Sequence, residues 1–139
     1  MRLLAPEPES SLTKMTEFDR TILIVEDDEL LRDAFKLLLE DAGYQVLEAG
    51  TAATALDLAQ ERRPDLLVLD LGLPDRPGLE VVRALRSDPE FLDIRVVALT
   101  GRVGEGEKRA CLEAGCDRYL AKPVSPVELL RELPELLRR

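Results

Sequence analysis

The stretch Leu66-Leu67-Val68-Leu69-Asp70 decides the fold, because it is the clearest buried strand in the chain. An uninterrupted apolar run of this length is typical of a strand that is covered on both faces. It ends in one carboxylate, Asp70, directly before the loop that begins Leu71-Gly72-Leu73-Pro74. Taken alone, Asp70 is an ordinary residue that ends a strand and begins a turn. The rest of the chain makes it a candidate reactive group.

Four more short apolar segments alternate with amphipathic segments along the chain. The predicted strands are Thr21–Val25, Tyr44–Glu48, Leu66–Asp70, Arg95–Thr100 and Arg118–Ala121. The predicted helices run from about Leu30 to Ala42, from Ala52 to near Pro64, from Gly78 to Arg86, from about Glu107 to Ala114, and from Ser125-Pro126 onward. Strict alternation of this kind predicts βαβ units, and therefore a parallel sheet with helices on both faces. We expect an α/β fold: a doubly wound, flavodoxin-like (βα)5 domain with strand order 2-1-3-4-5.

Two segments near the C-terminus carry more specific predictions. Three glycines between residues 101 and 106 predict a flexible turn before the helix that starts near Glu107. In the last helix, apolar spacing predicts that Val127, Leu130 and Leu133 are buried, and Pro134 is expected to kink or end the helix.

Length and charge bound the class of protein. The 139 residues suffice for one domain with a hydrophobic core. Residues 1 to about 20 are rich in Pro, Glu, Ser and Thr, so we expect a disordered or loosely attached leader before a domain over residues 21–139. The formal net charge of -9 disfavours direct contact with nucleic-acid phosphates. No apolar run approaches the roughly 20 residues of a membrane span, and the first residues lack the apolar stretch that is typical of a signal peptide. These features predict a cytoplasmic protein.

The cysteine and histidine content excludes several kinds of site. Cys111 and Cys116 stand close together, but the chain has no His and no second pair of cysteines. A zinc site or a thiol-imidazole catalyst cannot be assembled from them, so we expect buried free thiols. Without His, the chain cannot phosphorylate itself on histidine or use histidine as a general base.

Polar residues follow the predicted strands at the edge where parallel strands end. Asp27 and Asp28 follow the first strand, Asp70 ends the third, Thr100 the fourth, and Lys122 follows the fifth. Several carboxylates in one crevice must bind protons or a cation. Oxygen donors from Asp27 or Asp28, from Asp70 and from a loop carbonyl suit Mg²⁺. N-capping of the following helix is the alternative role for Asp27 and Asp28. The set suits a phosphoryl-accepting site in which Asp70 attacks phosphorus, with Lys122 and Thr100 contacting the transferred group.

The four motifs at these strand ends resemble one family. They are VEDD at Val25 to Asp28, LDLGLPD with Asp70 and Pro74, ALTG with Thr100, and YLAKP with Tyr119, Lys122 and Pro123. In this order and spacing, over about Thr21 to Leu133, they resemble the receiver domain of two-component response regulators. The chain resembles single-domain receivers of the chemotaxis-response-regulator kind, and its ALTG, GCDRYLAKPV and SPVELL segments look especially like receivers of hybrid histidine kinases.

The resemblance implies a set of roles. Asp70 would accept a phosphoryl group from a histidine kinase, a histidine phosphotransfer protein or a small phosphodonor. Asp27, Asp28 and Asp70, with the Gly72 backbone carbonyl, would hold Mg²⁺. Thr100 and Tyr119 would be the switch pair that changes the surface of the fourth helix, fifth strand and fifth helix, where a downstream protein partner would bind. Phosphorylation-linked dimerisation is one form this output could take. Such a domain is not an enzyme beyond assisting its own phosphorylation and dephosphorylation.

Two alternative functions stay open. A phosphatase of the haloacid dehalogenase type also uses a strand-ending Asp with Mg²⁺, but it normally has a second Asp two residues on, where this chain has Gly72. A degenerate receiver would act only as an unphosphorylated docking module. Turnover of a phosphomonoester would favour the first alternative, and failure to bind Mg²⁺ would favour the second.

Overall fold

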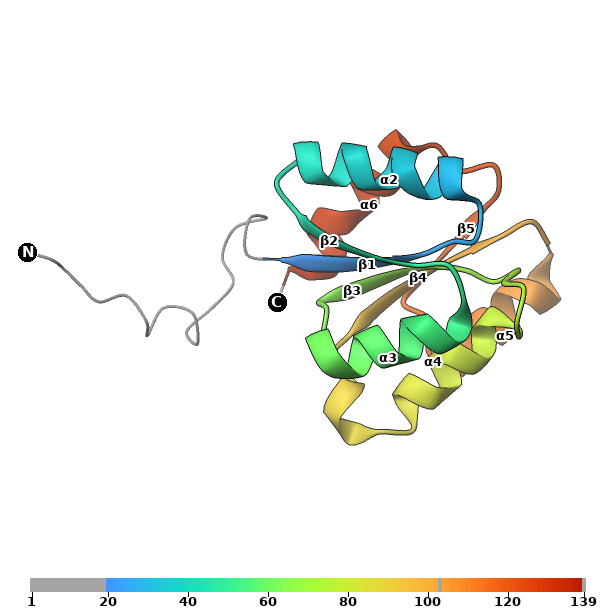
Figure 1. Cartoon of the computed structure of the whole chain (residues 1–139). Helices are drawn as coiled ribbons and strands as arrows, with labels where there is room; N and C mark the ends of the chain where they lie inside the picture. The colour runs from blue at the N-terminus through green and yellow to red at the C-terminus, as the bar shows by residue number, and fades with distance from the viewer. Residues whose placement is uncertain (1–19, 103, 139) are drawn as a thin grey trace, which may run out of the picture.

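A computed structural model describes residues 20–102 and 104–138. Its five parallel strands form one sheet in the order β2-β1-β3-β4-β5, which confirms the predicted topology (Figure 1). The strands are β1 (Thr21–Val25), β2 (Gln45–Ala49), β3 (Leu66–Asp70), β4 (Arg95–Thr100) and β5 (Arg118–Ala121). The helices are α2 (Glu29–Asp41), α3 (Ala52–Arg62), α4 (Gly78–Arg86), α5 (Glu105–Ala114) and α6 (Pro126–Leu137), with a short 3₁₀ helix at Pro89–Phe91.

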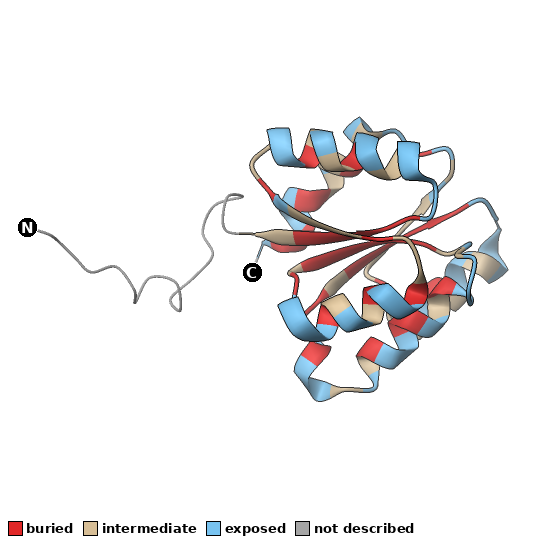
Figure 2. Ribbon diagram, viewed as in Figure 1, coloured by how far each residue is buried: buried red, intermediate tan, exposed pale blue. Residues whose placement is uncertain are grey.

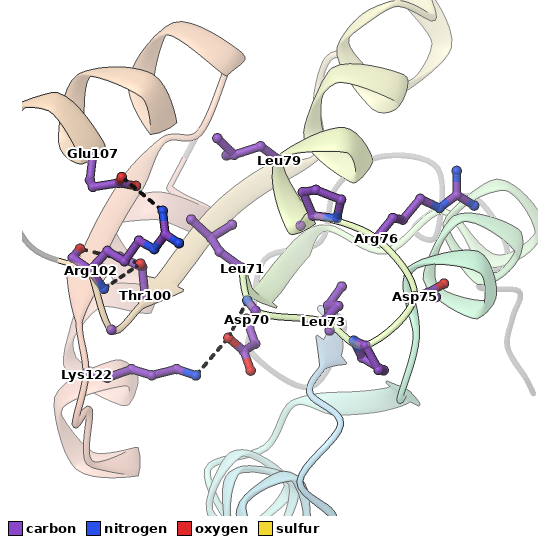
Figure 3. Close-up of a pocket in the computed structure, with 15 residues that line it drawn as sticks. Asp70, Leu71, Leu73, Asp75, Arg76, Leu79, Thr100, Arg102, Glu107 and Lys122 are labelled. Carbon is purple, nitrogen blue, oxygen red and sulfur yellow. Dashed lines mark hydrogen bonds and ion pairs between the residues drawn. The ribbon is translucent and has the colours of Figure 1, made fainter.

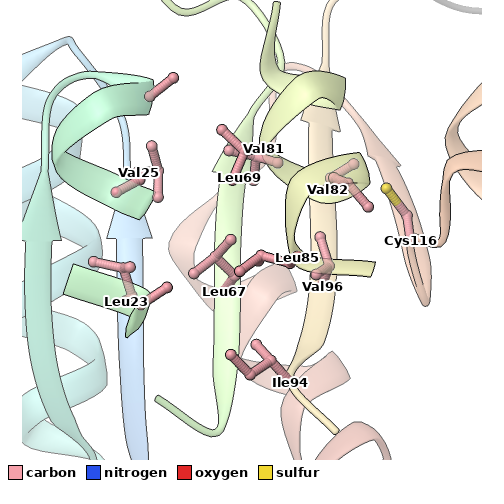
Figure 4. Packing of buried hydrophobic residues seen from close by; sticks show 14 of the residues in the cluster. Leu23, Val25, Leu67, Leu69, Val81, Val82, Leu85, Ile94, Val96 and Cys116 are labelled. Carbon is pink, nitrogen blue, oxygen red and sulfur yellow. The ribbon is translucent and has the colours of Figure 1, made fainter. Parts of the chain in front are cut away.

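The helices cover both faces of the sheet, so the molecule has three layers (Figure 1). Helices α2 and α6 pack on one face, and α3, α4 and α5 pack on the other. Because successive side chains of a strand point to opposite faces, β3 supplies both cores. Leu67 and Leu69 belong to the core under α3, α4 and α5 (Figure 4), whereas Leu66 and Val68 belong to the other. The strand is buried along its whole length (Figure 2).

Strand register brings the polar strand ends to one edge. In the parallel pairs, Val25 lies opposite Leu69, Asp70 opposite Leu99, and Thr100 opposite Ala121. The residues that follow β1, β3, β4 and β5 therefore start from one rim of the sheet, as the alternation of elements predicts.

The helix α5 begins earlier than the glycines suggested. It starts at Glu105, with Gly104 as its N-terminal flanking residue, so Gly106 lies inside the helix. Two acidic residues in its first turn, Glu105 and Glu107, interact favourably with the positive end of the helix dipole and offset the low helix propensity of glycine.

The predicted buried face of the last helix was wrong in part. Leu133 is buried, but Val127 is half exposed and Leu130 is only partly buried. The buried residues of α6 are Leu129, Leu133, Leu136 and Leu137. The helix also continues through Pro134 to Leu137, because burial of these leucines on the sheet offsets the cost of a proline, about 3 kcal/mol in a helix interior.

Other expectations have plain outcomes. Cys111 and Cys116 are buried free thiols, as predicted. Apart from Arg20, the predicted leader lies outside the described residues. Within the ranges 20–102 and 104–138, no helix has the length and apolar character of a membrane span.

Candidate functional site

A cleft of about 540 Å³ opens at the C-terminal ends of β3 and β4 (Figure 3). Its walls come from the loop between β3 and α4, from the residues after β4, and from Lys122 after β5. Four residues predicted for the site line it together: Asp70, Gly72, Thr100 and Lys122. Ligand sites of doubly wound sheets occupy this position, outside the carboxyl ends of the strands.

Asp70 is a buried carboxylate held by two donors. Its side chain is 3% exposed, and its Oδ1 lies 2.8 Å from Nζ of Lys122, which reaches in from the other wall (Figure 3). The backbone N–H of Gly72 donates to the same oxygen at 3.0 Å. Burial of a carboxylate is costly without such partners. The ammonium and the amide therefore keep an anionic oxygen at the floor of the cleft.

An acidic cluster lies beside Asp70. Carboxylate oxygens of Glu26, Asp27 and Asp70 all lie within 4.8 Å of one another. Glu26 is 2% exposed, and its Oε1 has no hydrogen-bond partner among residues 20–102 and 104–138. Burial is the largest cause of a Glu26 pKa raised to about 7, with the nearby Asp70 adding to it and the Asp28 N–H and Lys122 opposing it. Buried, mutually repelling oxygens with an unpartnered lone pair could hold a metal ion.

Asp28 lies outside this cluster, and Glu26 takes its expected place. The Asp28 Oδ1 accepts hydrogen bonds from the N–H groups of Leu30 and Leu31, at 3.0 and 3.2 Å, as the N-cap of α2. The capping alternative is therefore the one observed for Asp28. Glu26 was not among the site residues that we predicted from the sequence. The pairing of β1 with β3 places it there. Ile24 pairs with Val68, so two residues further along Glu26 comes opposite Asp70 on the same side of the sheet.

Helix α2 holds the loop that carries the acids. Its Arg32 donates from a guanidinium nitrogen to the Glu26 backbone carbonyl at 2.7 Å. The same guanidinium contacts Glu48 of β2 at 3.2 Å, and Lys36 pairs with the other Glu48 oxygen at 3.0 Å. Because Arg32 bridges β2 and the residue after β1, it fixes the backbone beneath the acidic cluster.

Thr100 and Tyr119 meet at one backbone carbonyl. Thr100 is buried, and its hydroxyl oxygen accepts from the Arg102 N–H at 3.0 Å. The Tyr119 hydroxyl donates to the Arg102 carbonyl at 2.7 Å, and the Thr100 hydroxyl lies 3.5 Å from that carbonyl oxygen. Arg102 thus connects the cleft residue Thr100 to a half-buried aromatic side chain on β5.

Comparison with known proteins decides the family. The family model for the response regulator receiver domain matches residues 22–134. The chain belongs to this family of receiver domains. Receiver domains are signalling domains of two-component systems, in which response regulators interact with kinases or phosphotransfer proteins and with downstream partners. The receiver resemblance noted in the sequence is therefore confirmed, and the acidic cluster of this receiver fits a site for Mg²⁺.

Related proteins place this receiver among several kinds of response regulator. It is 36% identical over 118 residues to the polar-differentiation response regulator DivK of Brucella anthropi, covering 85% of this chain and 96% of DivK. It is 42% identical over 120 residues to the phosphate regulon transcriptional regulatory protein PhoB of Pseudomonas aeruginosa, covering 86% of this chain but only 52% of PhoB.

Solved structures share the same fold. A putative response regulator from Chloroflexus aurantiacus superimposes with a TM-score of 0.80 at 34% identity, covering 86% of this chain and 98% of the other. The chemotaxis response regulator CheY4 of Vibrio cholerae gives 0.79 at 30% identity, covering 84% and 98%. This receiver therefore has the CheY-like fold with five parallel strands.

Proposed function

We propose that the receiver relays a two-component signal by accepting a phosphoryl group on Asp70. The observation that supports this most strongly is the environment of Asp70, which has one ammonium at 2.8 Å and oxygens of two further carboxylates within 4.8 Å. An aspartate with a purely structural role would need only the ammonium as a partner. An anionic nucleophile beside a cation and a set of oxygen donors is suited to phosphoryl transfer.

The transfer uses groups of the cleft, a phosphodonor and Mg²⁺. A carboxylate oxygen of Asp70 attacks phosphorus, the phosphorus–nitrogen bond of a partner's phosphohistidine breaks, and the electron pair leaves with the imidazole. Lys122 moves its contact from Asp70 to an oxygen of the transferred group and offsets its charge. Before transfer, the Thr100 hydroxyl oxygen accepts a hydrogen bond from the Arg102 N–H. After transfer, this hydroxyl donates a hydrogen bond to the phosphoryl group.

The donor set also supports a role for Mg²⁺. Glu26, Asp27, Asp70 and the Gly72 carbonyl would hold the ion, with Glu26 replacing Asp28 in the set that we inferred from the sequence. Hard oxygen ligands and the buried, unpartnered Glu26 Oε1 fit this ion. When bound, Mg²⁺ supplies positive charge that offsets the charge of the phosphoryl oxygens.

The output side of the proposal rests on Thr100 and Tyr119. Once Thr100 donates to a phosphoryl group, its contacts with Arg102 are lost, and the Arg102 carbonyl that accepts from Tyr119 is free to move. Tyr119 then changes position, and with it the surface of α5, β5 and α6, where a downstream protein binds. Phosphorylation-linked dimerisation through that surface and a cytoplasmic location belong to the same proposal.

Intact mass spectrometry tests the proposal. The protein is incubated with an acyl phosphate and Mg²⁺, and wild type is compared with Asp70→Asn and with Asp57→Asn, a matched change at an exposed residue of α3. We expect one phosphoryl adduct on wild type and on Asp57→Asn, and none on Asp70→Asn or with a chelator. No adduct on folded wild type would favour the docking module, and turnover without an adduct would favour a phosphatase.

A further inference from the structure

The loop between β3 and α4 is attached to a neighbouring helix by one side chain. Asp75 stands in the middle of this loop, and its carboxylate accepts two backbone hydrogen bonds from the start of α3. The Oδ1 atom accepts from the Ala52 N–H at 2.9 Å, and Oδ2 accepts from the Ala53 N–H at 3.1 Å. These bonds join residues more than twenty positions apart in the chain.

The contact completes the N-terminus of α3. The first N–H groups of a helix have no partner within it. Thr51, the N-cap residue, accepts from the Thr54 N–H at 3.2 Å, and Asp75 takes the two N–H groups before that. These two hydrogen bonds lower the pKa of Asp75, so the bidentate anion is the form present at neutral pH. The strength of the contact comes from this charge at the positive end of the helix.

The same contact bears on the phosphoryl site, because Asp75 belongs to the loop that carries Gly72. The Leu71 N–H donates to the Leu99 carbonyl at 2.9 Å, and the Gly78 N–H donates to the Leu71 carbonyl at 3.0 Å, so these bonds fix the two ends of the loop. Gly72 itself donates to Asp70. Asp75 lines the same cleft as Asp70 and Gly72, and it is the point at which the middle of the loop is held from outside (Figure 3).

We infer that Asp75 is a positioning residue of the phosphoryl site: by holding the loop on α3, it sets the place of the Gly72 carbonyl beside the acidic cluster. This inference rests on the proposed function, in which that carbonyl is a Mg²⁺ ligand. It assigns α3 a part in the site, although the helix contributes no residue to the cleft. Outer residues that orient ligands of this kind typically change metal affinity by 10- to 100-fold when they are removed.

The test separates positioning from a purely structural cap. Asp75→Ala and Asp75→Asn are compared with wild type and with Asp57→Asn, which removes the same charge from an exposed position on α3. The first readout is the Mg²⁺ concentration that gives half the maximal rate of Asp70 phosphorylation by an acyl phosphate. The second is the NMR position of the Gly72 carbonyl carbon and the Leu73 amide without Mg²⁺, and the third is urea unfolding.

We expect Asp75→Ala to raise the half-saturating Mg²⁺ concentration about tenfold, the lower end of the range for such residues, and to shift the Gly72 and Leu73 resonances. Asp75→Asn keeps one acceptor oxygen, so its effect should be smaller, and Asp57→Asn should match wild type. Loss of stability with unchanged Mg²⁺ dependence and unchanged Gly72 and Leu73 resonances would overturn the inference and leave Asp75 a helix cap. If wild type itself is not phosphorylated, the proposed function fails, and the resonance shifts alone then decide whether Asp75 holds the loop.

Discussion

Substitution of Gly78 by Ala should destabilise the domain and disturb the site, because the first residue of α4 touches the end of β3. A Cβ at Gly78 would stand 2.7 Å from Cα of Leu71 and 2.9 Å from the Asp70 carbonyl oxygen. Both contacts are with backbone atoms, which cannot rotate away. Carbon atoms pack at about 3.5–4.0 Å, so α4 and the residues after β3 would have to separate by roughly 1 Å.

The magnitude follows from two opposing effects. Overpacking of this kind typically costs about 1–3 kcal/mol. Replacing glycine in a helix gains about 0.5–1 kcal/mol at most, because glycine has the greater freedom in the unfolded chain. The expected net loss is about 1–2 kcal/mol, which for a domain of this size lowers Tm by roughly 5 °C. The moving atoms belong to Asp70 and Leu71, so the rate of phosphorylation should fall as well.

Urea unfolding followed by far-UV circular dichroism measures the change, and Gly106→Ala is the matched control. Gly106 lies inside α5, and a Cβ there meets no atom of the rest of the described chain within 4 Å. This substitution should stabilise the domain by about 0.5 kcal/mol through helix propensity alone. The two glycine substitutions therefore have opposite expected signs. A Gly78→Ala protein as stable as Gly106→Ala would refute the reasoning from the close approach.

Two further predictions concern the acids after β1. Asp27→Ala should raise the Mg²⁺ concentration that gives half the maximal rate of phosphorylation. Asp28→Ala should leave that concentration near the wild-type value and lower stability by about 0.5–2 kcal/mol, because the N-cap of α2 is lost. Equal effects of the two substitutions on the half-saturating Mg²⁺ concentration would contradict the placing of Asp28 outside the acidic cluster. In chelator, a Glu26 pKa of about 7 against 4.5 in the unfolded chain means that the native state binds more protons between these values. Wild type should therefore lose stability as pH rises from about 4.5 to 7 relative to Glu26→Gln, and parallel pH profiles of urea midpoints would contradict the buried, proton-binding Glu26.

Elements whose apolar pattern fits only one kind of secondary structure could be predicted from the sequence. Strands β3, β4 and β5 have the predicted ends, because each is a short apolar run closed by a polar or turn residue, and parallel alternation then brings Asp70, Thr100 and Lys122 together. The α6 face was harder. Five leucines and a valine are spread around that helix, and only packing against the sheet selects Leu129 and Leu133 over Val127.

The choice among three consecutive acids could not be made from residue types alone. Glu26, Asp27 and Asp28 all offer carboxylates, and each could cap a helix or hold a cation. The outcome depends on where α2 starts: Asp28 has the extended backbone of an N-cap, with φ -75° and ψ 111°, and its side chain turns to the helix. Glu26 continues the side-chain alternation of β1, so its side chain points into the protein and is buried beside Asp70.

The most direct test of the central claim locates the phosphoryl group on the chain. The protein is treated with an acyl phosphate and Mg²⁺, the acyl phosphate formed on the protein is reduced with borohydride, and peptides are sequenced by mass spectrometry. An aspartyl phosphate is converted to homoserine by this reduction, whereas a free carboxylate is not. We predict homoserine at position 70, dependent on both the phosphodonor and Mg²⁺. Homoserine at another aspartate, or an unmodified Asp70 in a folded sample, would contradict the account.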